Sequence, residues 1–311
     1  MRLPRAIVLL SGALILAFWV TGGHAQRSGR WTTAAPMPNE RTEVAATEVG
    51  GKVYVVGGLG GESLLEYDPA TDRWRVRASL LRALHHTTAV AVGGRLYVVG
   101  GYTEGWTPVD TVFEYDPAAD RWRERAKMPT ARGALGAGVI DGKIHAVGGV
   151  GRDGRNTGAH ELYDPGTDRW TRLAGVQTPR DHLAVGVATG RLYAIGGRVD
   201  GSYARNLDVN EEYDARADRW RTRAPLPTPR SGIAAATLDG KIFVFGGEAP
   251  AGTFNQVEAY DPATDKWSTW APMPTARHGL GAAAVAGRIF VISGGPRPGG
   301  SYSALNEVFT P

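Results

Sequence analysis

Short apolar runs that end in a double glycine recur along the chain and predict a repeated β-strand. In the clearest copy, Lys143–Val147 alternates and then runs apolar, as a strand buried on both faces should, and Gly148 and Gly149 end it. Small residues dominate the preceding stretch, Arg132–Ile140, which we expect to form the first strand of the unit. The pattern therefore predicts an all-β fold built from one recurring sheet.

The period of this pattern defines the architecture. The first glycines of the pairs are separated by 43, 48, 48 and 50 residues, and a sixth copy carries Ser293-Gly294. Five tyrosine–tryptophan pairs, each seven residues apart, follow the glycines. A glycine and aromatic period just under fifty residues indicates a β-propeller, and six copies indicate six blades of four strands. The glycine pairs begin at Gly57, Gly100, Gly148, Gly196 and Gly246, and the aromatic pairs are Tyr67/Trp74, Tyr115/Trp122, Tyr163/Trp170, Tyr213/Trp220 and Tyr260/Trp267.

Turn residues separate the strands of each copy. Asp141-Gly142 is typical of a two-residue hairpin, and Asp164-Pro165 predicts a turn between the third strand and the outer strand that Trp170 opens. Burial of these tyrosines and tryptophans between blades is the main force expected to hold the ring, because each ring can remove about 150–250 Å² from water. A role for the tryptophans as stacking platforms for a sugar or base is the alternative.

The two ends of the repeat array are incomplete in complementary ways. Trp31 precedes any double glycine and looks like an outer strand without a blade, whereas the last copy stops after Phe309 without a following tryptophan. We therefore expect Trp31 to supply the outer strand of the last blade and close the ring, which would leave no exposed sheet edge. On this interpretation, deletion of residues 27–38 should destabilise the fold strongly.

The N-terminus is predicted to be a separate segment. Arg2 and Arg5 precede an apolar run from Ala6 to Val20, and small residues then offer a cleavage site at Ala25. We interpret residues 1–25 as a secretory signal peptide and 26–311 as the propeller, with an uncleaved signal anchor as the alternative. The mature protein would be secreted or periplasmic, with no stable membrane insertion.

Composition excludes several function classes. Loss of the two arginines in the leader reduces the formal charge from +4 to +2, and no lysine or arginine run offers a phosphate track, so we expect no nucleic-acid partner. The chain has no cysteine, which removes disulfides, thiolate metal sites and a cysteine nucleophile. We expect no cofactor and a monomeric protein.

The motifs resemble those of the kelch repeat family over roughly residues 30–311. The best copy combines Arg230, Gly240–Val244, the double glycine at Gly246, Glu258 with Tyr260–Pro262, and Asp265–Trp267. The resemblance implies a kelch propeller but not one function, since the family includes peptide-binding adaptors, a bacterial periplasmic sialic acid mutarotase and copper-radical galactose oxidases. The last class requires a tyrosine–cysteine crosslink, which a chain without cysteine cannot make.

Repeated arginines are the first candidates for ligand binding. They precede the first strand in every blade except the second, where Leu84 stands instead, and they are Arg41, Arg132, Arg180, Arg230 and Arg277. If they surround one mouth of the channel, their guanidinium groups could bind carboxylates or acidic sugars. The alternative is structural, with each arginine bonding backbone carbonyls or a neighbouring blade's acid.

Loops of variable length should open on the same face as these arginines, where function is usually placed. The ligand-binding candidates among them are Arg198, Tyr102, Trp106 and Tyr203. His86 and His182 lie two residues beyond the arginine position, and we interpret them as polar lining of a wet channel. We predict no metal site, because blades two and four are not adjacent and we expect no carboxylate to share the spacing of these histidines.

The sequence therefore favours an exported binding module that recognises a peptide or a glycan at an arginine-rich mouth. The alternative is an acidic-sugar mutarotase, in which Glu248 would take and return an anomeric proton. This assignment follows from the resemblance, because Glu248 stands in a Gly-Glu-Ala segment like that of the mutarotase. A purely structural extracellular module would need no such site.

Overall fold

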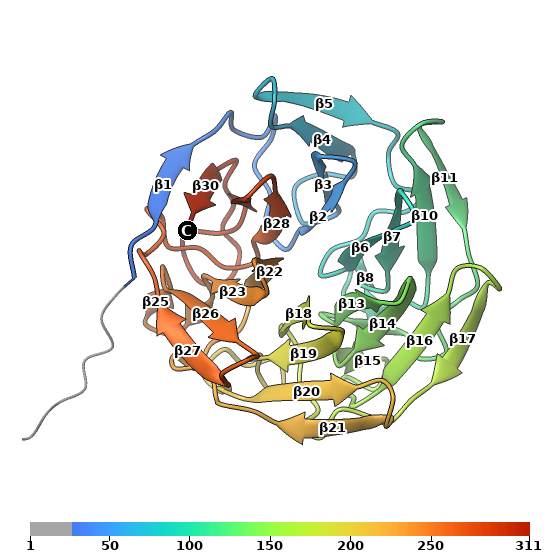
Figure 1. The fold of residues 1–311 in the computed structure, drawn as a ribbon. Helices are drawn as coiled ribbons and strands as arrows, with labels where there is room; N and C mark the ends of the chain where they lie inside the picture. The colour runs from blue at the N-terminus through green and yellow to red at the C-terminus, as the bar shows by residue number, and fades with distance from the viewer. Residues whose placement is uncertain (1–26) are drawn as a thin grey trace, which may run out of the picture.

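A computed structural model describes residues 27–311 and shows six four-stranded antiparallel sheets arranged in a ring (Figure 1). The first strands of all six sheets line a central channel. The predicted six-bladed β-propeller is confirmed. Within these residues no helix is present, and so none has the length and apolar character needed to cross a membrane. The predicted signal peptide, residues 1–25, lies outside the described part of the chain.

The blades follow one another along the chain, and each runs from an inner to an outer strand. Blades one to three contain β2 (Ala45–Val49), β3 (Lys52–Val56), β4 (Leu64–Asp68) and β5 (Arg73–Arg77); β6 (Thr88–Val92), β7 (Arg95–Val99), β10 (Val112–Asp116) and β11 (Arg121–Glu124); and β13 (Gly136–Ile140), β14 (Lys143–Val147), β16 (His160–Asp164) and β17 (Arg169–Arg172).

The second half of the ring repeats this order. Blades four to six contain β18 (Ala184–Ala188), β19 (Arg191–Ile195), β20 (Asn210–Asp214) and β21 (Arg219–Thr222); β22 (Ala234–Leu238), β23 (Lys241–Phe245), β26 (Val257–Asp261) and β27 (Lys266–Thr269); and β28 (Gly281–Val285), β29 (Arg288–Ile292), β30 (Asn306–Thr310) and β1 (Arg30–Thr33). Short ribbons in the loops are β8 (Tyr102–Thr103) with β9 (Thr107–Pro108), β12 (Arg132–Gly133) with β15 (Val150–Gly151), and β24 (Glu248–Ala249) with β25 (Gly252–Thr253).

The N-terminal strand closes the ring as expected. Trp31 of β1 is the register partner of Phe309 of β30, and the two rings lie 5.0 Å apart. The Trp31 indole also donates to the carbonyl of Ala271 in blade five at 3.0 Å. Residues from the two ends of the chain thus complete one sheet and bond it to its neighbour (Figure 1).

The inner strands are shorter than the sequence suggested. The stretch expected as one strand, Arg132–Ile140, divides into β12 and β13 because Ala134 between them has a φ of 54°, which interrupts the extended backbone. The expectation of small residues near the axis is supported at Gly186, where an added Cβ would lie 2.5 Å from the Ile242 side chain of the next blade.

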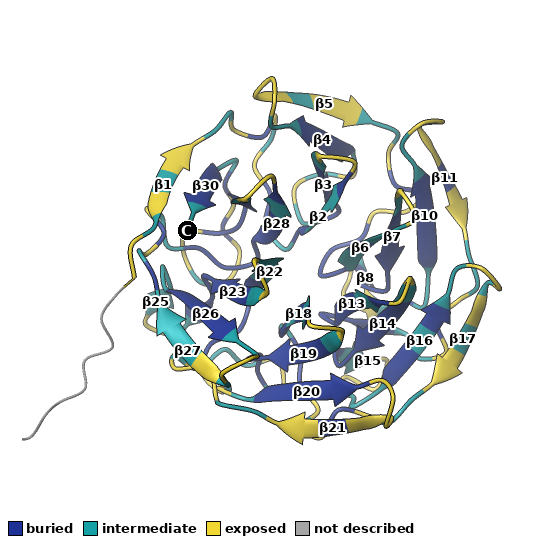
Figure 2. Ribbon diagram, in the orientation of Figure 1, coloured by how far each residue is buried: buried dark blue, intermediate teal, exposed yellow. Residues whose placement is uncertain are grey.

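Each tyrosine–tryptophan pair joins two blades. In blade four, Tyr213 and Trp220 are register partners, and the indole donates to the Ala174 carbonyl of blade three at 2.8 Å. Asp218 accepts from the Tyr213 hydroxyl at 2.7 Å and from the Ala174 amide at 2.9 Å. The outermost strands are largely exposed, whereas the inner three are buried or intermediate (Figure 2). The contact joins the outermost strand of blade four to the segment that leaves blade three.

Candidate functional site

The five repeated arginines are fully buried inside the blades. Arg180 illustrates the arrangement, since its guanidinium donates to the carbonyls of Thr178, Ala194 and Gly196 and pairs with Glu211 of β20. The corresponding acids for three others are Glu161, Glu258 and Glu307. Arg41 instead donates to Ser63 and to the Gly57 carbonyl.

This geometry corrects the expectation that Arg41, Arg132, Arg180, Arg230 and Arg277 present their charge at the mouth. Their relative exposure is 0%, and their partners belong to the same blade. Burial is costly enough to lower the pKa of Arg132 to about 10, a cost that is offset by carbonyl acceptors and the buried acid. These arginines fix the loop that precedes each first strand, and residues beyond them form the mouth.

A closed ring of backbone hydrogen bonds forms the mouth. The residue two positions after the arginine site has a left-handed φ between 51° and 65° in every blade. Its carbonyl accepts a backbone N–H from the next blade at 2.9–3.3 Å all the way round. The six residues are Glu43, His86, Ala134, His182, Gly232 and Gly279. Glycine adopts such a φ without strain, whereas Glu43, His86 and His182 hold a backbone conformation that is unfavourable for residues with large side chains.

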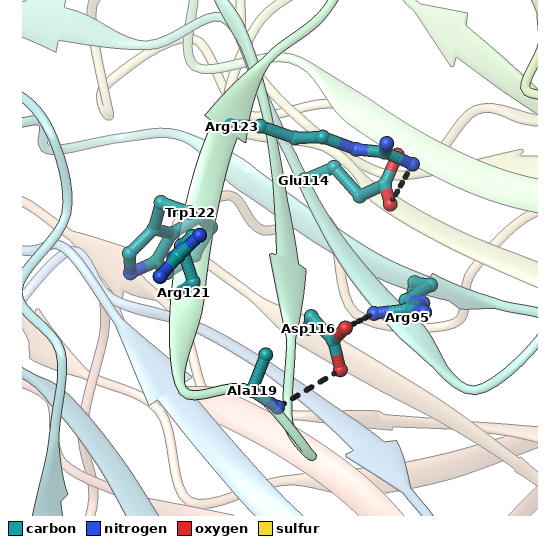
Figure 3. A pocket seen from close by; sticks show the side chains of 7 residues that line it. All are labelled: Arg95, Glu114, Asp116, Ala119, Arg121, Trp122 and Arg123. Carbon is teal, nitrogen blue, oxygen red and sulfur yellow. Dashed lines mark hydrogen bonds and ion pairs between the residues drawn. The ribbon is translucent and has the colours of Figure 1, made fainter.

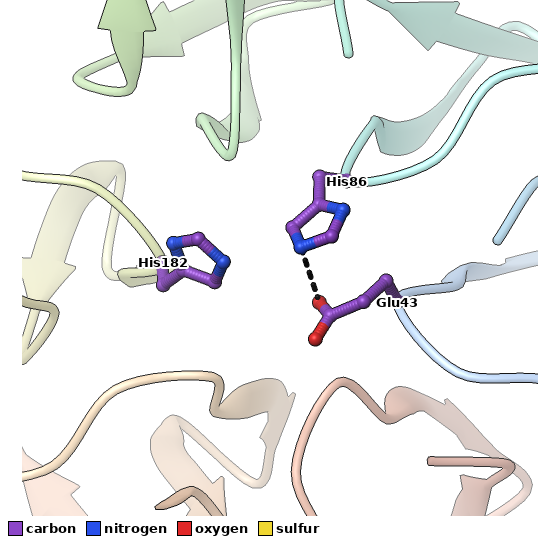
Figure 4. Close-up of side chains that lie close together, drawn as sticks. All are labelled: Glu43, His86 and His182. Carbon is purple, nitrogen blue, oxygen red and sulfur yellow. Dashed lines mark ion pairs between the residues drawn. The ribbon is translucent and has the colours of Figure 1, made fainter. Parts of the chain in front are cut away.

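Glu43 and His86 are neighbours on the ring, and their side chains meet at the mouth, with His182 opposite them (Figure 4). Nε2 of His86 lies 3.3 Å from Oε2 of Glu43. The other nitrogen of the His86 imidazole, Nδ1, lies 2.6 Å from Nδ1 of His85. Nε2 of His85 in turn lies 3.2 Å from the Thr103 carbonyl. Because a carbonyl only accepts, His85 carries its proton on Nε2 and accepts from His86 Nδ1–H. The Nε2 lone pair of a neutral His86 therefore points at Glu43.

Burial disfavours the protonated form of His86. It lowers the pKa of His86 well below its usual value, and the nearby His182, His85 and Arg198 contribute in the same direction. A neutral imidazole with its lone pair toward a carboxylate is an unfavourable contact unless a positive charge lies between them.

His182 is held by two charged neighbours. Its Nδ1 donates to Oδ1 of Asp181 at 2.5 Å, and its Nε2 lies 2.8 Å from Nη2 of Arg198. The same guanidinium donates to Oε1 of Glu248 at 2.7 Å. The predicted residues Arg198 and Glu248 are thus brought together, and Arg198 also lies over the ring of Tyr203 at 5.8 Å.

His278 and Glu248 complete the cluster from blades six and five. Nε2 of His278 lies 3.5 Å from Oε1 of Glu43 and 3.6 Å from Oε2 of Glu248. The second oxygen of Glu248 accepts from the Gly299 amide at 3.0 Å, so both oxygens of this carboxylate are already bonded. We refer to Glu43, His86, His182, His278, Asp181, Arg198 and Glu248 as the mouth cluster.

The mouth cluster has more negative than permanent positive charge. Its three carboxylates, Glu43, Asp181 and Glu248, have side-chain exposures of 11%, 0% and 3%. Among the described residues, their ion-pair partners are three histidines and the single guanidinium of Arg198. Buried carboxylates need compensating charge, so the arrangement favours a bound cation or protonated histidines.

Aromatic side chains lie against one side of the cluster. Tyr102 is 6% exposed and packs with His85 and His86, whereas Trp106 covers the same two histidines and remains 57% exposed. Trp106 has a φ of 61°, an uncommon conformation for a bulky residue. The second exposed aromatic residue of the described chain, Tyr302, belongs to a loop on the same face.

Two hollows open on this face. A cavity of about 80 Å³ lies at the ring, lined by Glu43, His86 and His182 with the residues that follow them. A larger cleft of about 540 Å³ lies between the loops of blades two and three, and it contains Asp110, Arg152, Asp153, Arg155 and Asn156. Asn156 donates to Asp181 at 2.5 Å and so links the cleft to the mouth cluster.

A third hollow, of about 310 Å³, lies away from the mouth beside β10 and β11 (Figure 3). Its acids are paired with its own arginines, Asp116 with Arg95 and Glu114 with Arg123. Since these acidic groups already have partners, the mouth is the stronger candidate site.

Sequence reasoning missed Glu43 and Asp181. Glu43 stands two residues after Arg41, the same spacing that singled out His86 and His182, so the signal was present in the sequence. Asp181 follows Arg180 directly, but its contact with His182 depends on side-chain directions that spacing does not reveal.

Comparisons with known proteins agree with the fold. A model of the kelch motif matches residues 40–81, 83–129 and 131–177, and a model described as the KLHDC2/KLHL20/DRC7 kelch-repeats domain matches residues 174–310. A solved structure titled "Structure of YjhT" is similar with a TM-score of 0.78 and 17% identity, over 90% of this chain and 97% of that one. No curated protein matches the sequence significantly.

Proposed function

Because this chain belongs to the kelch repeat family, we propose that it is an exported binding module that takes a peptide or a glycan on the loop face around the channel mouth. Kelch propellers commonly mediate protein binding. The loops on this face differ in length and sequence from one blade to the next, unlike the strands of the repeat. The export step rests on the predicted signal peptide.

The exposed indole of Trp106 carries this proposal. It stands at a strained position of the blade-two loop, beside a polar cluster, and the same loop contributes Asp110 to the 540 Å³ cleft. An indole face can stack on a sugar ring or cover an apolar side chain, and the cleft falls in the range of about 300–1,000 Å³ typical of ligand sites. Polar groups that fix a ligand's orientation are present in Arg152, Arg155 and Asn156.

Binding is tested on peptide and glycan arrays with the full chain and two matched variants. Trp106→Ala should lose most of the array signal, since indole stacking is the proposed anchor. Val76→Ala removes an apolar side chain that is somewhat more exposed than Trp106, from the outer strand β5, and should keep the signal. Equal signals from both variants, or no ligand on either array, would contradict the proposal.

An acidic-sugar mutarotase is the second candidate, and the contact between Arg198 and Glu248 favours it. A buried carboxylate beside a guanidinium can serve as a proton acceptor for an anionic sugar. Against it, both Glu248 oxygens are bonded and the 80 Å³ cavity is too small to enclose a sugar. If Glu248→Gln leaves the anomeric exchange rate of N-acetylneuraminic acid unchanged, this candidate is excluded.

A further inference from the structure

We propose that the mouth cluster binds one divalent transition-metal ion, with Glu43, His86 and His182 as its protein ligands. One potential ligand atom from each of these residues lies within 4.8 Å of the others. Figure 4 shows a ring nitrogen of each histidine and the carboxylate of Glu43 turned toward a common centre. The inference is independent of the proposed peptide or glycan ligand.

Distances at the pair Glu43–His86 match a shared metal. Two ligands bound about 2.1 Å from a tetrahedral ion lie about 3.4 Å apart, and the His86 Nε2 to Glu43 Oε2 distance is 3.3 Å. The hydrogen-bond chain through His85 uses Nδ1 of His86, so Nε2 is the ring nitrogen left to coordinate an ion. A metal between the two atoms would bond to both of them.

The second ring nitrogen of each proposed histidine ligand is hydrogen-bonded in the way that is usual for metal-bound histidines. A ligating histidine usually donates its other ring N–H to a fixed acceptor, often a carboxylate. His182 donates to Asp181 in this way, and His86 donates to His85. Arg198 would have to release His182 Nε2, but it retains its bonds to Asp181 and Glu248.

Charge and space favour the same conclusion. A divalent ion would compensate the excess of buried carboxylates over guanidinium in the mouth cluster. The 80 Å³ cavity holds an ion with one or two waters at about 30 Å³ each. Two imidazoles with one carboxylate suit Zn²⁺ or Co²⁺ better than Ca²⁺ or Mg²⁺, which prefer oxygen ligands. The competing explanation is that protonated His182 and His278 supply the charge.

The test uses the full chain without a polyhistidine tag, stripped by a chelator and titrated with Zn²⁺ in a calorimeter and with Co²⁺ in an absorption spectrometer. We expect one ion per chain and a Co²⁺ spectrum with imidazole ligation. His182→Gly should weaken binding by at least about 10-fold. This variant should fold, because blades five and six carry glycine at the same ring position with the same sign of φ.

Matched controls separate ligation from general charge effects. Glu43→Gln should also weaken Zn²⁺ by at least about 10-fold, whereas Glu40→Gln, in the same loop but exposed, should bind as the wild type does. If Glu43→Gln fails to fold, the result for His182→Gly alone tests the proposal. Absence of saturable binding to the wild type, or wild-type affinity in His182→Gly, would overturn the proposal in favour of protonated histidines.

Discussion

Arg180 and Glu211 form a buried ion pair within blade four, with Nη1 of the arginine 2.5 Å from Oε2 of the glutamate. Both side chains are almost fully buried, and the guanidinium also donates to three backbone carbonyls. The pair joins the loop at the mouth to the third strand of the same blade. Its relatives in blades three, five and six repeat the contact, so the repeated arginine is part of the scaffold.

Removal of one partner from this pair should be costly. Arg180→Met would leave the Glu211 carboxylate buried without its counter-charge, so the free energy of unfolding should fall by about 3–5 kcal/mol. Arg172→Met is the control, since Arg172 is 75% exposed and its pair with Glu161 at 3.9 Å should contribute about 1 kcal/mol or less. Urea unfolding measures both, and equal losses would contradict the structural role.

Ring closure makes a second prediction. A chain lacking residues 1–38 loses β1, and with it the contacts of Trp31 with Phe309 and Phe245. Trp31 is half-buried, so loss of its side chain alone should cost less than the value of about 3–5 kcal/mol for a fully buried large aromatic residue, and exposure of the β30 edge adds to this. A chain lacking residues 1–26 should keep its melting temperature. Closely similar melting temperatures for the two truncations would show that β1 does not close the ring.

Two buried histidines predict how stability depends on pH. His145 Nδ1 lies 2.9 Å from His160 Nε2, and burial lowers the pKa of His145 to about 4 and that of His160 to about 3. In the unfolded chain both titrate near about 6.5, so the unfolded state binds more protons as pH falls. The stability from these neutral histidines is therefore complete above pH 7 and declines progressively from about pH 6.5 toward pH 4.

Urea unfolding at pH 7.5 and pH 5 tests this directly. The wild type should lose stability by up to about 1.4 kcal/mol per histidine for each pH unit below 6.5. The double variant His145→Gln/His160→Gln should show a smaller loss across the same interval, even if it is less stable at pH 7.5. An identical pH dependence in the two proteins would mean that these histidines are not the titrating groups.

The repeat made the fold predictable, whereas the site needed side-chain directions. Spacing alone placed Trp31 beside Phe309 and the turn at Asp141-Gly142, since both depend on register and backbone conformation. It also placed Arg180 near the mouth, but whether that side chain faces the channel or the blade interior depends on a contact with Glu211, thirty-one positions away.

The residues at the mouth could be predicted from the sequence only in part, for the same reason. Arg198, Glu248, Tyr102 and Trp106 were expected on this face, and the structure brings them to it. Glu43 shares the ring position of His86 and His182, and an alignment of the blades on the arginine would have revealed it. Hydrogen-bond chains such as that from Thr103 through His85 to His86 have no counterpart in the sequence pattern.

Hydroxyl-radical footprinting of the full chain, with and without its strongest array ligand, tests most directly whether function lies at the mouth. Trp106 and Tyr302 are the exposed aromatic residues of the loop face, and Val76 reports on the outer strand. We predict that the ligand protects Trp106 from oxidation several-fold and leaves Val76 unchanged. Unchanged oxidation of Trp106, with protection of the outer strands instead, would contradict a binding site at the mouth.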